Sequence, residues 1–374
     1  MTGYNLELGH DQLYHKEKFC LSLNVENERI TNAKSQFGYN HRGFEKMMEY
    51  RNWMQNLSIV SRVCTNSFSH EMAYVKGVEE LLDLKVPERA NYLRTIVLEI
   101  GRIMNHQSYL ERFANATGIS GLSSWIDYDI DYFTDLLDEL TGRRFYYSYI
   151  VPGGVKYDCS EEWINKLKTV ISYIEKRLEY YNNFLFKSRV FLKRTQNIGK
   201  VTKEEAVMWN MSGPNLRASA VDRDVRKDLP YASYEKIDFE IPCYPNLERF
   251  DCGEGGDVYT RTVVRFLEIE KSIEIIENCV KNLPQGEHIS KSLPSLSDWK
   301  IPEGIAFSKV ESGRGELSYL LVSDGSDKPR RVHIIPPSLL NGTLVLENVL
   351  KDAELEDVPL IFQSLDISPL EVDR

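Results

Sequence analysis

PERANYLRTIVLEIGRIMNH, residues 87–106, is the stretch from which the architecture of this 374-residue chain is most readily inferred. Its proline opens the segment, a position that the first turn of a helix accepts. The apolar residues of the stretch recur every three or four positions, at Leu93, Ile96, Val97, Ile100 and Met104. This spacing predicts a helix that buries one apolar stripe.

Two later segments carry the same pattern. In the first, Ser160 suits an N-cap, and Glu161 and Glu162 follow it where the helix dipole favours negative charge. The apolar stripe of this helix comprises Ile164, Leu167, Ile171, Ile174, Leu178, Tyr181 and Leu185. A third stripe, which ends before Pro284 and Gly286, comprises Val263, Phe266, Ile273, Ile276 and Val280. Long helices with such stripes pack as a bundle.

Strand patterns flank this helical part at both ends. Residues 19–25 alternate between apolar and polar before a polar turn at 26–28, which predicts a two-stranded element. Residues 307–338 predict β-hairpins around the turn SDGS at 323–326. We therefore expect an α+β, mainly α fold, with a long-helix bundle core and small β elements at the N- and C-terminal ends. The expected regions are an N-terminal β-rich region at 1–50, a helical core at 51–288, and a C-terminal β-hairpin region and tail at 289–374.

The composition argues against several classes of protein. A net charge of −10 without a basic patch argues against nucleic-acid binding. No apolar run approaches the roughly 18–20 residues that span a bilayer, and the opening MTGYNLELGHDQ lacks the regions of a signal peptide. We expect a cytoplasmic chain, or one that meets a membrane only through other subunits. None of the six cysteines forms a CxxC pair, which argues against a zinc or iron–sulfur site built by this chain alone.

Several sequence islands match one superfamily, in order along nearly the whole chain. They are HRGFEK (41–46), SRVCTNSFSHEMAYVKGVEELL (61–82), the opening stretch 87–106, TGRRFYYSYIVPGGV (141–155), SGPNLRASAVDRDVRK (212–227), GRGELSYLLVSDGSDKPRRVHIIPPS (313–338) and EVDR (371–374). In this order and spacing the chain resembles the large subunits of nickel–iron and energy-converting hydrogenases and the quinone-site subunit of respiratory complex I. The resemblance implies a partner small subunit whose iron–sulfur cluster delivers electrons to a cavity. That cavity is expected between the N-terminal region and the helical core, close to the C-terminus.

The chain departs from the hydrogenase pattern at the metal ligands. Hydrogenases hold nickel and iron with four thiolates, and the matching positions here are Cys64, Ser67, Ser368 and Glu371. Soft thiolate ligation needs paired cysteines at short spacing. We therefore expect no metal, no cofactor bound by this chain itself, and no hydrogenase activity.

The chain also departs from the complex I pattern at the quinone donors. The histidine of the family's Gly-Pro-x-His-Pro loop falls on Gln12, although His10 and His15 are near. The family's quinone-binding tyrosine falls on Thr65, and a histidine that tracks the cluster's redox state falls on Tyr146. These departures argue against quinone as the substrate.

A third branch of the superfamily matches this pattern best, namely the membrane-bound sulfane-sulfur reductases. Their complexes carry electrons from ferredoxin to polysulfide-type substrates and pump ions. A thiolate can attack an S–S bond, and a nearby cation raises the thiolate fraction. Cys64 is the candidate nucleophile, and Arg62 and Arg42 are the candidate cations. The structural alternatives are a buried relic of the ancestral ligand and arginines that only form ion pairs.

The remaining candidates surround the former metal site. His41 is a candidate proton donor, and Glu371 a candidate proton relay, with Glu45 as a second relay. The structural alternatives are a capped histidine and a tail that EVDR only anchors. The predicted catalytic set is Cys64, Arg62, His41, Arg42 and Glu371, and the predicted substrate cavity contains Ser67, Thr65, His10, Asp366 and Ser368.

The sequence thus predicts the electron-output subunit of a ferredoxin-linked, ion-pumping membrane oxidoreductase complex that reduces sulfane sulfur or polysulfide. Its expected partners are the iron–sulfur small subunit, other hydrophilic-arm subunits and membrane-arm subunits. Its expected location is peripheral, on the cytoplasmic side of the cell membrane. Two alternatives stay open: a quinone- or phenazine-type reductase that uses His10, and a structural subunit that only couples the cluster to the membrane arm.

The replaced ligands give the first testable prediction. Because Ser67, Ser368 and Glu371 stand where thiolates are needed, the purified complex should contain no stoichiometric nickel. Its iron should be accounted for by the partner's iron–sulfur clusters. Elemental analysis checks this, and one nickel per complex, or hydrogen evolution, would contradict it.

Overall fold

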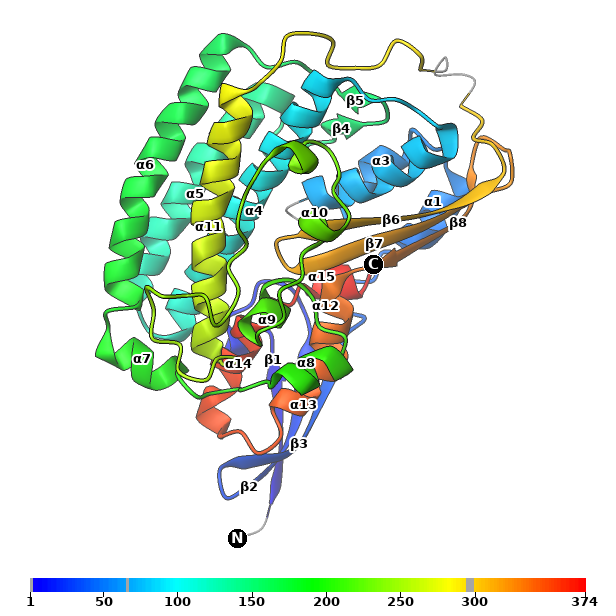
Figure 1. The fold of residues 1–374 in the computed structure, drawn as a ribbon. Coiled ribbons are helices and arrows are strands. Elements are labelled where there is room, and N and C mark those ends of the chain that lie inside the picture. The colour runs from blue at the N-terminus through cyan, green and yellow to red at the C-terminus, as the bar shows by residue number, and fades with distance from the viewer. Residues whose placement is uncertain (1–2, 65–66, 294–298) are drawn as a thin grey trace.

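The computed structural model describes residues 3–64, 67–293 and 299–374 and confirms the expected α+β, mainly helical fold class (Figure 1). Long helices form the bundle: α4 (Glu88–Ala116), α5 (Ser120–Thr141), α6 (Glu161–Leu185) and α11 (Val258–Lys281). Helix α4 packs against α5 and α11, and α6 packs against the same two neighbours. None of the helices in the described ranges combines the length and apolar character that a membrane span requires.

The ends of these helices follow from local chemistry. The Ser160 hydroxyl caps α6 by accepting the backbone N–H of Trp163 at 3.1 Å, as its sequence position predicts. Asp257 caps α11 by accepting the N–H of Thr260 at 2.7 Å. Helix α4 begins directly after Pro87 and runs ten residues beyond His106. The predicted apolar stripes therefore lie inside longer helices.

Shorter helices connect the bundle to the rest of the chain. Those before or within the bundle are α1 (Phe44–Tyr50), α2 (Asn56–Val60), α3 (Phe68–Leu82), α7 (Arg189–Thr195), α8 (Lys203–Met208), α9 (Gly213–Ala218) and α10 (Val225–Asp228). The C-terminal tail is helical too, with α12 (Pro337–Leu340), α13 (Leu346–Val349), α14 (Val358–Ser364) and α15 (Pro369–Val372). Helix α3 contacts both the bundle, at α4, and the C-terminal sheet.

The strands form two antiparallel three-stranded sheets and one short pair. The N-terminal sheet contains β1 (Tyr4–Gly9), β2 (Cys20–Glu26) and β3 (Arg29–Gln36). The sequence predicted only two strands here, because β1 is mostly exposed and half-buries only Leu6 and Leu8. The C-terminal sheet contains β6 (Gly304–Ser312), β7 (Gly315–Ser323) and β8 (Pro329–Ile335), and the short pair is β4 (Ile150–Val151) with β5 (Gly154–Val155). The turn between β7 and β8 is the predicted SDGS turn.

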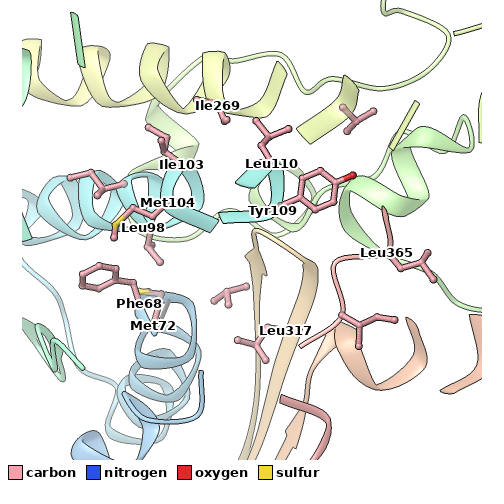
Figure 2. Close-up of a cluster of buried hydrophobic side chains, with 14 of the residues drawn as sticks. Phe68, Met72, Leu98, Ile103, Met104, Tyr109, Leu110, Ile269, Leu317 and Leu365 are labelled. Carbon is pink, nitrogen blue, oxygen red and sulfur yellow. The ribbon is translucent and has the colours of Figure 1, made fainter. Parts of the chain in front are cut away.

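All three predicted regions contribute to a shared hydrophobic core. Figure 2 shows Phe68 of α3 facing Leu98 and Met104 of α4, with Leu317 of β7 and Leu365 of the tail nearby. The N-terminal sheet is tied to the tail as well, since the Glu347 carboxylate accepts the backbone N–H of Ser35 at 2.8 Å. The N-terminal sheet and helices α13 and α14 of the tail therefore lie together below the bundle (Figure 1).

This core gives a stability prediction. Leu110 of α4 is fully buried, so Leu110→Ala should destabilise the fold by about 2–5 kcal/mol through lost burial and a residual cavity. Val207→Ala on α8, where the side chain is 59% exposed, is the matched control and should change stability by at most about 0.5 kcal/mol. Heat unfolding of the assembled complex measures both, and equal unfolding temperatures would contradict the packing described.

Candidate active site

The two ends of the chain enclose the candidate site. The Asp373 carboxylate accepts the backbone N–H groups of Gly38 and Asn40 at 2.6 and 2.7 Å. The His41 ring nitrogen Nδ1 lies 2.6 Å from the Asp373 carbonyl oxygen. An open cavity of about 450 Å³ is lined by both segments, including His41, Glu45 and Arg374. The tail thus closes against the N-terminal loop, and this cavity lies between the loop, the tail and Arg331 of the C-terminal sheet.

Cys64 lies in a buried group with His70 of α3 and Glu371 of α15. The Cys64 Sγ, one His70 ring nitrogen and one Glu371 carboxylate oxygen all lie within 4.8 Å of one another. His70 Nδ1 is 2.9 Å from the Tyr319 hydroxyl, which orients the ring. Nε2 lies 3.6 Å from Glu371 Oε1, a contact that is longer than a hydrogen bond. His70 therefore bridges the Tyr319 hydroxyl and the Glu371 carboxylate.

Arg314, in the turn between β6 and β7, fixes the charge of this group. Its Nη1 donates to Glu371 Oε1 at 3.1 Å, and the Ser338 hydroxyl donates to Oε2 at 2.6 Å. Burial is the largest single effect and favours the neutral acid, but the Arg314 charge, His70 and the Ser338 hydroxyl together lower the pKa of Glu371 to about 2. Against the effect of its own burial, Arg314 has its pKa raised by Asp366, Glu371 and the Cys64 sulfur. The guanidinium is therefore permanently charged and within electrostatic range of that sulfur.

Asp366 is a buried, ionised carboxylate beside Arg314. It accepts from Arg112 at 2.6 Å and from the Asn105 amide at 3.0 Å, both on α4. Burial opposes its ionisation, but Arg314 and Arg112 lower the pKa of Asp366 to about 2. The carboxylate therefore joins α4 to the tail.

The two serines at former ligand positions are engaged by carboxylates. Ser67 Oγ donates to Glu71 Oε1 at 3.1 Å, and Ser368 Oγ donates to Glu17 Oε2 at 2.8 Å. Burial raises the pKa of Glu71 to about 7 and also raises that of Glu17. With one thiolate and two occupied hydroxyls, these residues do not fit a nickel–iron centre.

A different metal ion meets an electrostatic obstacle here. Cys64, His70 and Glu371 lie close enough together to act as three ligands. Both Glu371 oxygens, however, already accept hydrogen bonds, and the Arg314 guanidinium repels a cation. The surroundings favour an anion.

The two predicted cations play different parts. Arg42 donates to the carbonyls of Arg62 and Val63, each at 2.7 Å, and so holds the loop directly before Cys64. Burial lowers the pKa of Arg42, and the Cys64 sulfur is among the charges that oppose the fall. Arg62 is exposed, and its guanidinium lies 5.2 Å from the ring centroid of Tyr146. These contacts associate Arg42 with Cys64, whereas those of Arg62 lie on the surface.

The other predicted residues are spread around this group. His10 is half-buried before the short helix η1 (Asp11–Leu13), and its ring contacts Asp11 at 3.4 Å. Of the same loop it is Glu17 that reaches the tail, by its bonds to Ser368 and to the Leu370 N–H. Thr65 lies outside the described residues. Glu45 accepts from Arg374 at 3.0 Å and from the Ile334 N–H at 2.9 Å, which anchors the tail.

Sequence reasoning missed three residues of the site: His70, Arg314 and Glu17. The sequence held a signal for His70, because it and Glu71 interrupt a largely apolar stretch of α3. Polar side chains at buried positions are uncommon and mark sites with a specific role. Arg314 stands between two glycines in a turn, and Glu17 in an irregular loop. No periodic pattern marks either position, and their partners are distant in sequence.

A long-helix bundle with small antiparallel sheets at both ends of the chain is the fold of oxidoreductase subunits of the complex I and hydrogenase large-subunit type. The family model described as "Respiratory-chain NADH dehydrogenase, 49 Kd subunit" matches residues 117–297 and 289–374. The D subunit of NADH-quinone oxidoreductase from Thermosipho melanesiensis is 36% identical, covering 95% of each chain. Its counterpart from Clostridium beijerinckii is 34% identical, covering 94% of this chain and 91% of its own. The chain belongs to the family of this 49 kDa subunit.

A solved structure extends the likeness to the sulfur branch. A chain in the structure of the membrane-bound sulfane sulfur reductase, an archaeal respiratory membrane complex, matches with a TM-score of 0.93 and 35% identity. The match covers 99% of this chain and 98% of that chain. The expected superfamily resemblance is confirmed over nearly the whole length.

The buried ion pair predicts how stability depends on pH. Glu371 has its pKa lowered from 4.5 to about 2, so its contribution is present above about pH 4.5 and is lost as pH falls toward about 2. At 1.4 kcal/mol per pH unit, this contribution is about 3 kcal/mol. Glu371→Gln should lower the unfolding temperature of the complex strongly near pH 7 and much less near pH 3.

The exposed Glu26 of β2 supplies the control for this measurement. Glu26→Gln should leave the unfolding temperature nearly unchanged at both pH values, since an exposed group gains little from folding. An effect of Glu371→Gln that is equally large at low pH would show that the ion pair with Arg314 is not its cause.

Proposed function

We propose that this chain is the electron-output subunit of a ferredoxin-linked, ion-pumping membrane complex that reduces sulfane sulfur or polysulfide. The observation that carries the proposal is the setting of Cys64: its sulfur lies within 4.8 Å of ligand atoms of His70 and Glu371 and within electrostatic range of Arg42 and Arg314. The whole-length likeness to a chain of the sulfane sulfur reductase complex supports it.

The site suits attack by a thiolate on an S–S bond. The charges of Arg42 and Arg314 favour the anionic sulfur of Cys64, against the opposing effects of burial and of the ionised Glu371 carboxylate. That thiolate forms a bond to one substrate sulfur, and the other sulfur leaves with the electron pair as a thiolate or hydrosulfide anion. Two electrons, supplied by the iron–sulfur cluster of the partner, then cleave the mixed disulfide, restore the Cys64 thiolate and release the second anion.

His70 and the arginines have distinct parts in this chemistry. The Nε2 atom of His70 lies within the buried group, 3.6 Å from Glu371 Oε1, and can give a proton to the departing sulfur anion. Arg314 stabilises the anions as they form. Arg42 positions the Cys64 loop through its two carbonyl contacts.

The wider setting of the proposal follows the family. The chain binds no cofactor itself, and the iron–sulfur small subunit approaches the end where the N-terminal loop meets the tail. Other hydrophilic-arm and membrane-arm subunits complete the complex, with ferredoxin as upstream donor. The protein lies peripherally on the cytoplasmic side of the membrane.

Quinone reduction is the second candidate, because the relatives at 34–36% identity are named as D subunits of NADH-quinone oxidoreductase. The structure offers little to bind a quinone head at the family's histidine position. The Gln12 amide oxygen there accepts the backbone N–H of Gly9 at 2.8 Å. If the chain is a quinone reductase or a structural coupling subunit, Cys64 has no part in the reaction, and its substitution should not change turnover.

Substitution of the thiol tests the proposal. Cys64→Ser in the assembled complex should abolish trisulfide or polysulfide reduction while the clusters stay reducible by ferredoxin. Serine is similar in shape, but its hydroxyl remains protonated near neutral pH and attacks sulfur poorly. Steady-state turnover and the spectrum of the reduced clusters are the two measurements.

Cys20→Ser is the matched control, since Cys20 lies in β2 of the N-terminal sheet. This variant should turn over at the wild-type rate. Near-normal sulfur reduction by Cys64→Ser would mean that the partner's cluster reduces the substrate directly, with Cys64 only packing nearby. Quinone reduction that survives Cys64→Ser in a complex unable to reduce polysulfide would favour the second candidate.

A further inference from the structure

A second group of charges is buried between the bundle and the β6–β7 sheet, outside the candidate site. Its members are Arg102 and Glu99 of α4, Arg217 of α9, Asp224 and Arg226 at the start of α10, Glu268 of α11 and Glu311 of β6. None of these side chains is more than 3% exposed. They form a continuous network of ion pairs, in which Arg217 binds Asp224 and Glu311, each at 3.1 Å.

The charges of this network do not balance. Arg102 pairs with Glu99 at 3.3 Å and with Glu268 at 3.5 Å. Arg226 pairs with Glu99 at 3.2 Å and with Asp224 at 2.8 Å. Together with Arg217 the network holds three guanidiniums and four carboxyl groups, and an unbalanced buried charge is costly. One bound proton makes the network neutral.

The surroundings single out which carboxyl holds that proton. Although burial favours their neutral forms, the arginines lower the pKa values of Glu99, Asp224 and Glu268. At Glu311, burial and the charge of Asp224 outweigh Arg217 and raise the pKa to about 7. His106 contacts Glu268 at 2.8 Å, but burial lowers its pKa, so it supplies no positive charge.

We propose that Glu311 is a proton-binding site that exchanges its proton with solvent through the cavity beside it. This cavity, of about 90 Å³, is lined by Glu311, Asp224 and Glu316 and by the exposed Arg223 and Asn210 at its outer side. Its volume is sufficient for ordered water, which can relay protons.

The groups that face Glu311 come from every element packed on it. Glu316 stands directly opposite in the β6–β7 ladder and is paired with Lys309 at 2.6 Å. The charged side chains around the Glu311 carboxyl are Arg217, Asp224 and Arg226, and the Val225 N–H donates to it at 3.2 Å. Arg102 and Tyr231 contact the Glu311 main chain. Lys76 of α3 donates to the carbonyl of Lys309, two residues before Glu311. Glu316 is paired with Lys309 outside the network, whereas the Glu311 carboxyl contacts Arg217 and the Val225 N–H, so its charge belongs to the buried network.

The proton site is structurally connected to the Cys64 group. Arg102 donates to the carbonyls of Glu311 and Ser312 at 2.7 and 3.0 Å, and the same turn carries Arg314. Helix α4 also supplies Asn105 to Asp366. These contacts join the backbone beside Glu311 to the turn that carries Arg314. This inference goes beyond the proposed sulfur reduction and does not depend on its substrate.

Infrared spectroscopy of the assembled complex, without substrate, tests the proposal. A protonated carboxyl gives a C=O band that a carboxylate lacks and that shifts in D₂O. In the wild type, part of this band should disappear as pH rises from about 6 to about 8. Glu311→Gln should lack that component, whereas the matched control Glu316→Gln, in the same cavity and opposite strand position, should keep it. Glu71 also has a pKa of about 7, so Glu71→Gln should remove a separate component.

If the Glu311→Gln variant does not assemble into the complex, a second variant still tests the proposal. Glu311→Asp keeps the carboxyl but moves it away from Arg217, so its band should remain and its midpoint pH should shift. A Glu311→Gln spectrum identical to the wild type, or a Glu311→Asp midpoint equal to the wild type, would overturn the proposal. Loss of sulfur reduction in any variant has no bearing on this result.

Discussion

Removal of the Arg314 guanidinium would leave two carboxylates, Glu371 and Asp366, buried without their main compensating charge. Breaking such a buried pair costs about 3–5 kcal/mol, a large part of the stability of an ordinary domain. Because Glu371 lies in α15 and Arg314 in the β6–β7 turn, this interaction holds the tail against the sheet. The tail in turn binds the N-terminal loop through Asp373. The Arg314 guanidinium thus holds the tail in place, and the tail in turn holds the N-terminal loop.

The replacement of metal ligands forms a consistent chemical pattern. At the positions that match the hydrogenase thiolates, this chain has hydroxyls that donate to Glu71 and Glu17, and a carboxylate held by Arg314. Hydrogen bonds and an internal guanidinium therefore organise these positions.

The sequence supported the bundle well and the site only in part. Helices α4, α6 and α11 were predictable because their apolar stripes and their starting residues are local features of the sequence. Strand β1 was missed although Tyr4, Leu6 and Leu8 alternate with Asn5 and Glu7, because the segment is short and only partly buried. Resemblance led to Cys64 and Glu371, but the roles of His70, Arg314 and Glu17 depend on neighbours that only the tertiary fold brings close. The exposure of Arg62 also depends on the tertiary fold, because Arg62 is exposed while Val63, the next residue, is buried.

The contact between Asp373 and Gly38 joins residues 335 positions apart, and that between Ser368 and Glu17 joins residues 351 apart. Contacts of such separation carry a high loop-closure entropy and form slowly. The pocket around Cys64 should therefore be among the last parts of the protein to take shape, after the bundle has consolidated. A half-folded chain would contain the thiol but neither its arginine nor its carboxylate.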